Sequence, residues 1–376
     1  MDDPLTNGLI QHAEDLRRLA NVLGAQDVVG VDTESNSLHA YREQVCLLQF
    51  GDAQADYLVD PLILLDLSAL GPLFASTKIV KVFHAAEYDV LCLKRDFNFQ
   101  FANIFDTMVA ARTLGRKAVG LGSLVEAEFG IHLDKHAQRA NWGRRPLPQD
   151  MLDYARQDTH YLLRLREILS AELMEKGLMA LAEEDFRMLC QLEAPLPEGE
   201  RDIWHINGVH DLSPAQAAIL QELSTYRAKT AHAMDRPLFK VIGDKTLAAI
   251  AAAAPGSLRE LGAIAGMTQN QVQRHGRAIL QAVQRGMKAA PMHYPRPPKP
   301  DERYLARVEA LRKWRKEAAE KMDVESDVVL PRTVMQRLAL DNPRSLEALR
   351  LSMAETPWRL ERFGKQILEV LRKLGK

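Results

Sequence analysis

Two short segments place acidic side chains where a folded chain buries its residues. Asp32 and Glu34, in VVGVDTES, are two positions apart on a predicted strand, so both point to one side of a sheet. Tyr154 and Asp158 are four positions apart in DMLDYARQDTHYLLRLREIL, on an apolar helix face that three leucines continue. Because an isolated buried carboxylate is too costly to keep, these groups predict a counter-charge or a metal ion. Acidic side chains from distant segments that point to one interior typically bind a hard cation.

A further carboxylate, Asp89, stands in HAAEYDVLCL, where a predicted strand ends and a helix begins. Taken alone, each acidic position has an ordinary explanation. The DTE triplet could be a surface turn, Asp89 could stabilise the helix dipole, and Tyr154 could be a hydrogen-bonded core tyrosine. Their order along the chain favours a site, since the triplet lies on the first strand of a predicted sheet and the Tyr-x3-Asp pair on a late helix.

The elements that must position these residues form a mixed sheet flanked by helices, an α/β domain. Strands are expected at 27–34, 44–51, 56–60 and 79–85, the first three as a meander. Helices are expected over Glu87–Arg95, over IFDTMVAARTL, over LGSLVEAEF and, as one long helix, from about Pro148. After the proline-containing EAPLPEGER the chain has a helical pattern throughout.

The helical half contains a repeat with an offset of 88 residues. The matching segments are HGRAIL and FGKQIL, PGSLREL and PRSLEAL, Met234-Asp235 and Met322-Asp323, and Arg227 and Arg315. Only the segments around Thr246 and Thr333 slip by one residue. We therefore expect two copies of one small helical bundle, joined by the semi-rigid spacer PMHYPRPPKP.

These patterns divide the 376 residues into predicted domains. The α/β domain is expected at 1–195, a linker at 196–207, the first helical module at 208–290, a proline-rich linker at 291–300, and a second, divergent module at 301–376.

The composition is that of an ordinary globular protein, with 47% hydrophobic and 26% charged residues. The acidic N-terminal segment lacks the apolar core of a signal peptide, and no apolar run is long enough to span a membrane. Cys46, Cys92 and Cys190 are odd in number and far apart. This spacing excludes a cysteine-built zinc site and favours a reducing compartment, so we expect a cytoplasmic protein with no membrane partner.

The net charge of −1 conceals a division between the two halves. Residues 1–200 hold 19 Lys and Arg against 31 Asp and Glu, a charge of −12, whereas residues 201–376 hold 30 against 19, a charge of +11. An acidic half joined to a basic half suggests a metal-dependent site that is delivered to a polyanion such as a nucleic acid. Basic helical surfaces are also common without such a role.

Together the motifs resemble the DEDD family of 3′→5′ exonucleases, in its tyrosine-bearing subclass, and within it the ribonuclease D proteins. The first family motif corresponds to the DTE triplet, the second includes Asp89, and the third is the Tyr-x3-Asp pair. The segment WGRRPL is similar to the WxxRPL that precedes the catalytic helix in ribonuclease D, and the two repeats look like HRDC modules. The resemblance implies a ribonuclease H-like exonuclease domain followed by two all-α bundles.

The resemblance also implies a catalytic site formed by Asp32, Glu34, Asp89, Tyr154 and Asp158, with two divalent cations, Mg²⁺ or Mn²⁺, held by the four acids. By resemblance Asp32 bridges the two cations, while Glu34 and Asp158 hold the one that activates water. Asp89 helps to hold the second cation, and Tyr154 orients the attacking water. Oxygen ligands favour these hard cations.

Other residues near the motifs allow two interpretations. His84 and His160 are expected to be structural, because His160 points away from the Asp158 face of the helix. Trp142, Arg144 and Arg145 could contact RNA by stacking and by phosphate binding. They could equally form a loop that Trp142 anchors in the core.

The leading prediction is a cytoplasmic, metal-dependent 3′→5′ exoribonuclease that trims structured RNA such as tRNA precursors and releases nucleoside 5′-monophosphates. We expect it to act as a monomer without a small-molecule cofactor. Two alternatives remain: a DNA 3′→5′ exonuclease, since the same site serves both polymers, and a nucleic-acid-binding protein with a silent nuclease domain. The intact set of buried acids argues against the silent domain.

Overall fold

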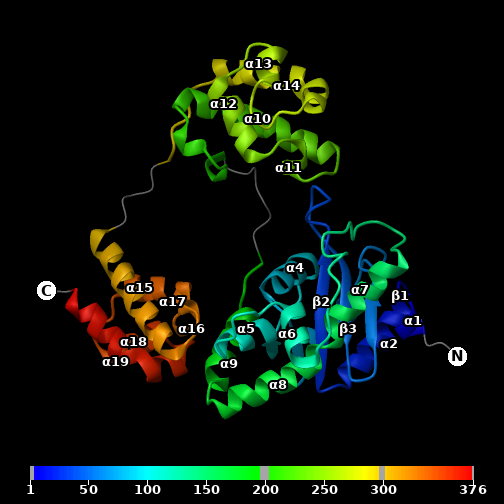
Figure 1. Ribbon diagram of the computed structural model, residues 1–376, viewed down its shortest axis with the longest axis vertical. Coiled ribbons are helices and arrows are strands. Elements are labelled where there is room, and N and C mark those ends of the chain that lie inside the picture. Colours follow the sequence, from blue (N-terminus) through cyan, green and yellow to red (C-terminus); the bar gives the residue numbers. More distant parts are fainter. Residues whose placement is uncertain (1–3, 195–202, 296–300, 375–376) are drawn as a thin grey trace. The chain divides into compact units, whose positions relative to one another are not determined.

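The structure is a computed structural model that describes residues 4–194, 203–295 and 301–374 (Figure 1). These residues fold into two compact units. The larger unit combines the α/β domain with the second helical module, and the smaller unit combines the first helical module with residues 35–44. None of the helices in the described ranges is long and apolar enough to cross a membrane.

A six-stranded mixed sheet forms the centre of the α/β domain (Figure 1). Its strands are β1 Leu9–Ile10, β2 Val28–Ser35, β3 Val45–Gly51, β4 Asp56–Val59, β5 Val80–Phe83 and β6 Ile104–Asp106, in the spatial order β1-β4-β3-β2-β5-β6. β3 and β4 are antiparallel, whereas β2, β5 and β6 run parallel to one another. The four predicted strands and the meander of the first three are confirmed.

Helices cover both faces of this sheet. They are α1 Pro4–Asn7, α2 Ala13–Gly24, α3 Gly71–Ala75, α4 Glu87–Phe97, α5 Thr107–Thr113, α6 Leu121–Phe129, α7 Gln149–His160, α8 Leu162–Glu175 and α9 Met179–Cys190. Val29 and Val31 of β2 pack into one core with Leu19 of α2, while Val82 of β5 packs into another with Leu165 of α8. Alternate strand residues therefore serve opposite layers, as the period of two requires.

Two predicted helices differ from the structure. The segment IFDTMVAARTL begins with the short strand β6, and its helix starts only at Thr107, where the Asp106 side chain caps the backbone N–H groups of Met108 and Val109. The predicted long helix breaks at Tyr161 into α7 and α8. The apolar face itself is confirmed, because Leu165 and Leu169 are buried on α8.

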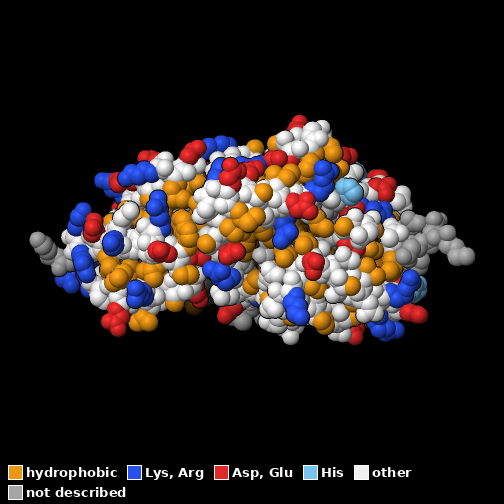
Figure 2. All heavy atoms as spheres, turned by 90° about the horizontal axis from the view of Figure 1, so that it is seen from below, with side chains coloured by type: hydrophobic (Ala, Val, Ile, Leu, Met, Phe, Trp, Pro, Cys, Tyr) orange, Lys and Arg blue, Asp and Glu red, His pale blue; other side chains and the backbone are white. Residues whose placement is uncertain are grey.

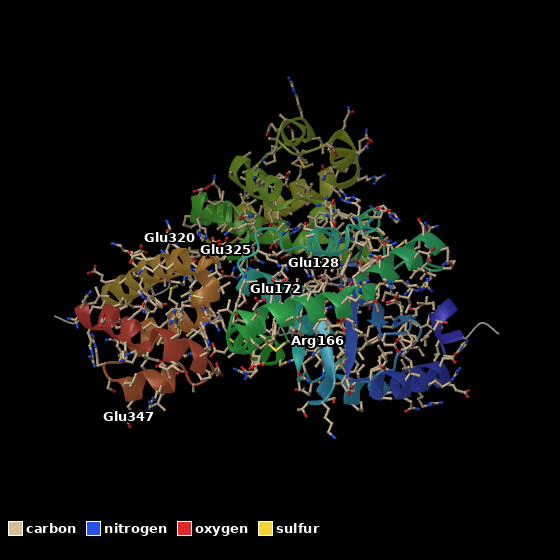
Figure 3. The ribbon with its side chains drawn as sticks, turned by 60° about the horizontal axis from the view of Figure 1, so that its bottom comes forward. Glu128, Arg166, Glu172, Glu320, Glu325 and Glu347 are labelled. Atoms are coloured by element: carbon tan, nitrogen blue, oxygen red, sulfur yellow. The ribbon has the colours of Figure 1, made fainter. Side chains whose placement is uncertain are left out.

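Arg116, in the turn between α5 and α6, ties this layer together. Its guanidinium bonds the carboxylates of Glu128 on α6 and Glu172 on α8, which lie near one another in Figure 3. Paired charges at partly buried positions lock the register of packed helices more than they add to stability.

The two helical modules repeat one another with an offset of 88 in the structure as well. The first has α10 Pro214–Ala233, α11 Leu238–Val241, α12 Asp244–Ala253, α13 Leu258–Gly262 and α14 Gln269–Lys288; the second has α15 Glu302–Met322, α16 Ser326–Val329, α17 Arg332–Asp341, α18 Leu346–Ser352 and α19 Pro357–Lys373. Arg227 bonds the Ile242 carbonyl at 3.1 Å, and Arg315 bonds the Leu330 carbonyl at 2.9 Å. The one-residue slip expected around Thr246 is wrong, since α12 and α17 begin 88 residues apart.

Within the larger unit, the second module is joined to the α/β domain by a buried ion-pair network. Arg359, at the start of α19, bonds Glu184 at 2.8 Å and Asp185 at 2.9 Å on α9. Arg359 and Glu184 are both 0% exposed. Arg112 of α5 also pairs with Asp327 of α16 at 2.8 Å.

Within the smaller unit, residues 35–44 pack on the first module. The ring of Tyr41 meets that of His232 edge-on, and its backbone N–H bonds Asp235 at 3.0 Å. The sequence analysis placed Ile203 and Ile206 in the linker, but both are buried in the core of this module. Their apolar side chains pack against the apolar faces of its helices. The rest of that linker (195–202) and residues 296–300 of the second linker lie outside the described residues. The other domain boundaries stay predictions.

Candidate active site

The structure brings the five predicted site residues together from three elements. Asp32 and Glu34 come from β2, Asp89 from the first turn of α4, and Tyr154 and Asp158 from α7. Each acid acts electrostatically on at least one of the others, across 126 positions for Asp32 and Asp158. The pattern read from three distant segments is therefore one cluster in space.

Burial and mutual repulsion define the electrostatics of this cluster. Burial and then the charges of Asp32, Asp158 and Asp89 raise the pKa of Glu34 to about 10. Burial, followed by Asp158, raises the pKa of Asp32 well above its usual range. Burial raises the pKa of Asp158 to about 7. No basic side chain of the described residues offsets the pKa shifts of these four acids, which therefore favour an added positive charge.

Thr33, which lies between Asp32 and Glu34 in the sequence, holds the carboxylate of Asp89 in place. Its hydroxyl donates a hydrogen bond to the Asp89 carboxylate. Asp89 is 6% exposed, and burial followed by the charge of Asp32 raises its pKa. The sequence analysis gave Thr33 no role of its own. The sequence feature that could have pointed to Thr33 is Asp89 itself, because a buried acid in the first turn of a helix needs a hydrogen-bond donor.

Tyr154 is held rigidly beside the acids. Its ring is 8% exposed and lies between those of His136, edge-on at 5.7 Å, and Trp142, at 6.1 Å between ring centres. Burial and then the charges of Asp158 and Glu34 raise the pKa of the Tyr154 hydroxyl above its ordinary value. At neutral pH the group is therefore a protonated phenol that can orient a ligand.

The C-terminal end of α7 is fixed to the sheet through Asp56 of β4. The Asp56 carboxylate bonds the Thr159 hydroxyl at 3.1 Å and His160 Nδ1 at 2.8 Å. A Cβ atom at Gly51 would lie 2.9 Å from the Asp56 carboxylate and 3.2 Å from the Thr159 carbonyl oxygen, so the close approach of α7 requires glycine there. His160 thus has the structural role that was expected.

The loop before α7 is anchored in the core. Trp142 is 1% exposed, and Arg145 forms a two-pronged ion pair with Asp60, at 2.6 and 2.7 Å, and bonds the Cys46 carbonyl at 2.7 Å. These contacts leave Trp142 and Arg145 little freedom to bind RNA, so the core-anchor interpretation holds for both. Arg144 is exposed.

The second motif is supported by Asp106. Its carboxylate accepts hydrogen bonds from the backbone N–H groups of Ala85, at 3.2 Å, and Ala86, at 2.7 Å, just before α4. His84 bonds the Thr107 hydroxyl at 2.9 Å, and burial lowers its pKa. His84 therefore has the structural role predicted for it, next to the acids but bonded to the framework.

The chemistry of the donor set suits a hard divalent cation. The four acids offer carboxylate oxygens, and oxygen donors of this kind select Mg²⁺, Mn²⁺ or Ca²⁺. In the described residues, no three acidic, histidine or cysteine side chains are already arranged so that they could hold a metal ion. The raised pKa values, which come first from burial, show that the four acids lack a compensating charge.

Comparison with known proteins agrees with this site. Residues 8–174 match the 3′–5′ exonuclease domain family, and residues 216–283 and 305–371 match the HRDC domain family. The chain is 31% identical over 290 residues to ribonuclease D of Desulfotalea psychrophila, covering 76% of this chain and 77% of that protein. It is 30% identical over 344 residues to RRP6-like 1 of Arabidopsis thaliana. The match covers 85% of this chain but only half the length of that longer protein.

Solved structures show the same fold. The catalytic core of RRP6 from Trypanosoma brucei, 28% identical, covers 75% of this chain and 80% of its own with a TM-score of 0.65. Escherichia coli RNase D, 24% identical, aligns over 97% of this chain and 98% of its own with a TM-score of 0.70, which supports the fold. The chain belongs to the ribonuclease D family of 3′–5′ exonucleases, with an exonuclease domain followed by two HRDC modules.

Proposed function

We propose that this protein is a metal-dependent exoribonuclease that removes nucleotides one at a time from the 3′ end of RNA and releases nucleoside 5′-monophosphates. The observation that carries this proposal is the convergence of four acids, Asp89 buried and the others half-buried, all with raised pKa values, beside a buried tyrosine. The ribonuclease D and RRP6 proteins among its relatives support RNA as the polymer. Structured RNA such as tRNA precursors is the proposed substrate class.

Asp32, Glu34, Asp89 and Asp158 would hold two divalent cations, Mg²⁺ or Mn²⁺. When bound, such ions activate a water molecule and stabilise the departing 3′ oxygen. Tyr154 would supply the remaining positioning: its ring contacts the rings of His136 and Trp142, and its hydroxyl, which keeps its proton, would orient the attacking water. The pinned end of α7 keeps Tyr154 and Asp158 in fixed relation to the acids of β2.

RNA anchoring is proposed for the first HRDC module. Over the face seen in Figure 2, basic and acidic side chains are interspersed, so the positive charge has to be located on individual elements. Residues 208–290 hold ten Lys and Arg against five Asp and Glu. On α14, Arg274, Arg277 and Lys288 are exposed along one side of the helix. Exposed cations on one side of a helix can contact phosphates of an RNA strand.

We further propose that the protein acts as a monomer in the cytoplasm. One chain contributes all five site residues, so catalysis needs no second copy. Cys46, Cys92 and Cys190 are odd in number and far apart in the sequence, which suits a reducing compartment.

The test is a cleavage assay with 3′-labelled RNA and DNA oligomers in Mg²⁺, Mn²⁺ or EDTA. We expect labelled mononucleotide from RNA with either metal, none in EDTA, and none from Asp32→Asn, which should still fold and bind RNA. Equal rates on DNA would favour the DNA exonuclease alternative. Binding without cleavage by the wild type would indicate the silent domain, and full activity in Asp32→Asn would overturn the metal-site assignment.

A further inference from the structure

Gln49, in the middle of β3, is a buried amide without a partner. Its side chain is 0% exposed, and within the described part of the chain neither its Oε1 nor its Nε2 atom has a hydrogen-bond partner. An unsatisfied buried amide costs on the order of 1–3 kcal/mol, which an apolar residue of the same shape would avoid. A polar group kept at such a position needs an explanation.

The register of β3 against β2 locates this amide. The backbone N–H of Asn36, just after β2, bonds the carbonyl of Gln44, just before β3, at 3.3 Å. At the other end, a Cβ atom on Gly30 would lie 3.5 Å from the Gly51 carbonyl oxygen. The end of one strand is thus beside the start of the other, so the two strands are antiparallel neighbours.

Each of the two strands places a glycine against α7. Cβ atoms on Gly30 and on Gly51 would each lie 3.2 Å from the carbonyl oxygen of Thr159, so both positions face α7. Two residues further along β2 is Asp32, and two residues back along β3 is Gln49. Because side chains alternate with a period of two, Gln49 and Asp32 lie on the same face of the sheet as these two glycines, the face that α7 covers.

The Asp32 carboxylate can accept further hydrogen bonds. Asp32 accepts a hydrogen bond from the backbone N–H of Thr33, and a carboxylate can accept about four in all. The other groups that act on Asp32 are acids, which offer no donor once a cation has drawn off their protons. The Gln49 amide is a neutral donor on the same face of the sheet as the residue that most needs one.

We propose that Gln49 is a positioning residue for the metal site: its side-chain amide, unpartnered in this structure, would donate a hydrogen bond to the Asp32 carboxylate when that carboxylate holds a cation, and would so orient it. The proposal rests on the metal site proposed above. Outer partners of metal-binding side chains act in this way, and their loss typically lowers metal affinity about 10- to 100-fold.

The test compares Gln49→Met with the wild type, by calorimetric titration of the metal-free proteins with MnCl₂ in the absence of RNA. Methionine has nearly the shape of glutamine without its donor. We expect the dissociation constant for Mn²⁺ to rise about 10- to 100-fold. The melting temperature of the metal-free variant should equal or exceed that of the wild type, because the substitution removes an unpaired buried amide.

Three further variants make the result decisive. Leu48→Met alters the opposite face of the same strand and should leave Mn²⁺ affinity unchanged. Gln49→Leu replaces Gln49→Met should the latter fail to fold. Asp32→Asn should abolish Mn²⁺ binding; if it binds as the wild type does, the metal site and the role of Gln49 fall together. If Asp32→Asn loses binding while Gln49→Met keeps wild-type affinity and only melts earlier, Gln49 is a packing residue and this inference alone is refuted.

Discussion

At the scale of single residues, conflict between a side chain and its predicted position was the informative signal. Asp32 and Asp158 stood out because acids occupied positions that periodicity assigns to the interior, and both belong to the cluster. Gln49 carries the same conflict in a milder form, as an amide in the apolar strand QVCLLQFG. It was not predicted, because glutamine is tolerated at strand edges and only the observed strand arrangement places it on the same face of the sheet as Asp32.

The burial of the acids predicts a gain of stability on removing the charge of one of them. Burial raises the pKa of Asp158 to about 7, so at pH 8 the carboxyl is largely ionised, and folding moves this charge out of water. Asp158→Asn should therefore raise the unfolding free energy in EDTA on the order of 1–2 kcal/mol. Thermal unfolding with and without MnCl₂ tests this: Mn²⁺ should stabilise the wild type but not the variant. A lower melting temperature of the variant in EDTA would mean that Asp158 is already compensated by the chain.

Tyr154→Phe should lower the single-turnover rate of cleavage without changing the affinity for an RNA 3′ end, because only the hydroxyl that orients water is lost. The raised pKa also predicts the pH dependence. A hydroxyl that keeps its proton above pH 10 contributes no alkaline ionisation, so the ratio of wild-type to variant rates should stay constant from pH 7 to 9.

A ratio that grew with pH across this range would instead identify Tyr154 as a general base. Weakened RNA binding with an unchanged chemical step would show that the ring merely packs against substrate.

At the scale of elements, the sequence predicted most strands and helices but missed the helix break and the short strand that tertiary contacts determine. The apolar stripe from α7 to α8 is continuous, so periodicity alone extended one helix across Tyr161. The break coincides with the contacts of Thr159 and His160 to Asp56, about a hundred positions earlier in the chain. The strand β6, only Ile104–Asp106, is too short for a period-two pattern to appear.

The two modules diverge at one equivalent position. Gln271 in the first module and Arg359 in the second are 88 residues apart; Gln271 bonds the Val241 carbonyl at 3.1 Å, and Arg359 bonds the Val328 carbonyl at 2.8 Å. Arginine alone has further donors, which reach Glu184 and Asp185 on the exonuclease domain. This exchange adds a buried ion-pair network to the surface pairs, such as Arg112 with Asp327, that also join the second module to the α/β domain.

Arg359→Met should therefore destabilise the larger unit by about 3–5 kcal/mol, because it leaves Glu184 buried and unpaired. Combining it with Glu184→Gln should recover much of the loss, and a double-mutant cycle from urea unfolding measures the coupling. Gln271→Met, at the matched position of the first module, is the control and should cost about 1 kcal/mol or less. Equal effects of the two single variants would contradict a special docking role for Arg359.

At the scale of the whole molecule, the division of charge assigns catalysis to the first half and substrate anchoring to the second. Deleting everything after residue 205 is a poor test of this assignment. The deletion would remove Arg359 with the basic surfaces and would leave the acids of α9 unpaired. Substitutions on exposed helix faces separate anchoring from folding, because surface changes away from packed groups usually shift stability by about 0.5 kcal/mol or less.

The repeat itself supplies the matched pair of variants. Arg274 and Arg277 on α14 correspond, at the offset of 88, to Arg362 and Lys365 on α19, and all four are exposed. Residues 301–376 hold 17 Lys and Arg against 13 Asp and Glu, a weaker excess than the ten against five of the first module. We therefore expect Arg274→Glu with Arg277→Glu to weaken RNA binding, whereas Arg362→Glu with Lys365→Glu changes it little.

The measurement is the affinity for a tRNA precursor across a salt series. Each lost phosphate contact lowers the slope of log K against log salt by about 0.7 on single-stranded RNA, so the α14 variant should lose about 1.4. Cleavage of a very short oligomer, which depends mainly on the active site, should be unchanged in both variants. Identical slopes for the wild type and the α14 variant would refute RNA anchoring by the first module, and an equal loss in the α19 variant would extend that role to both modules.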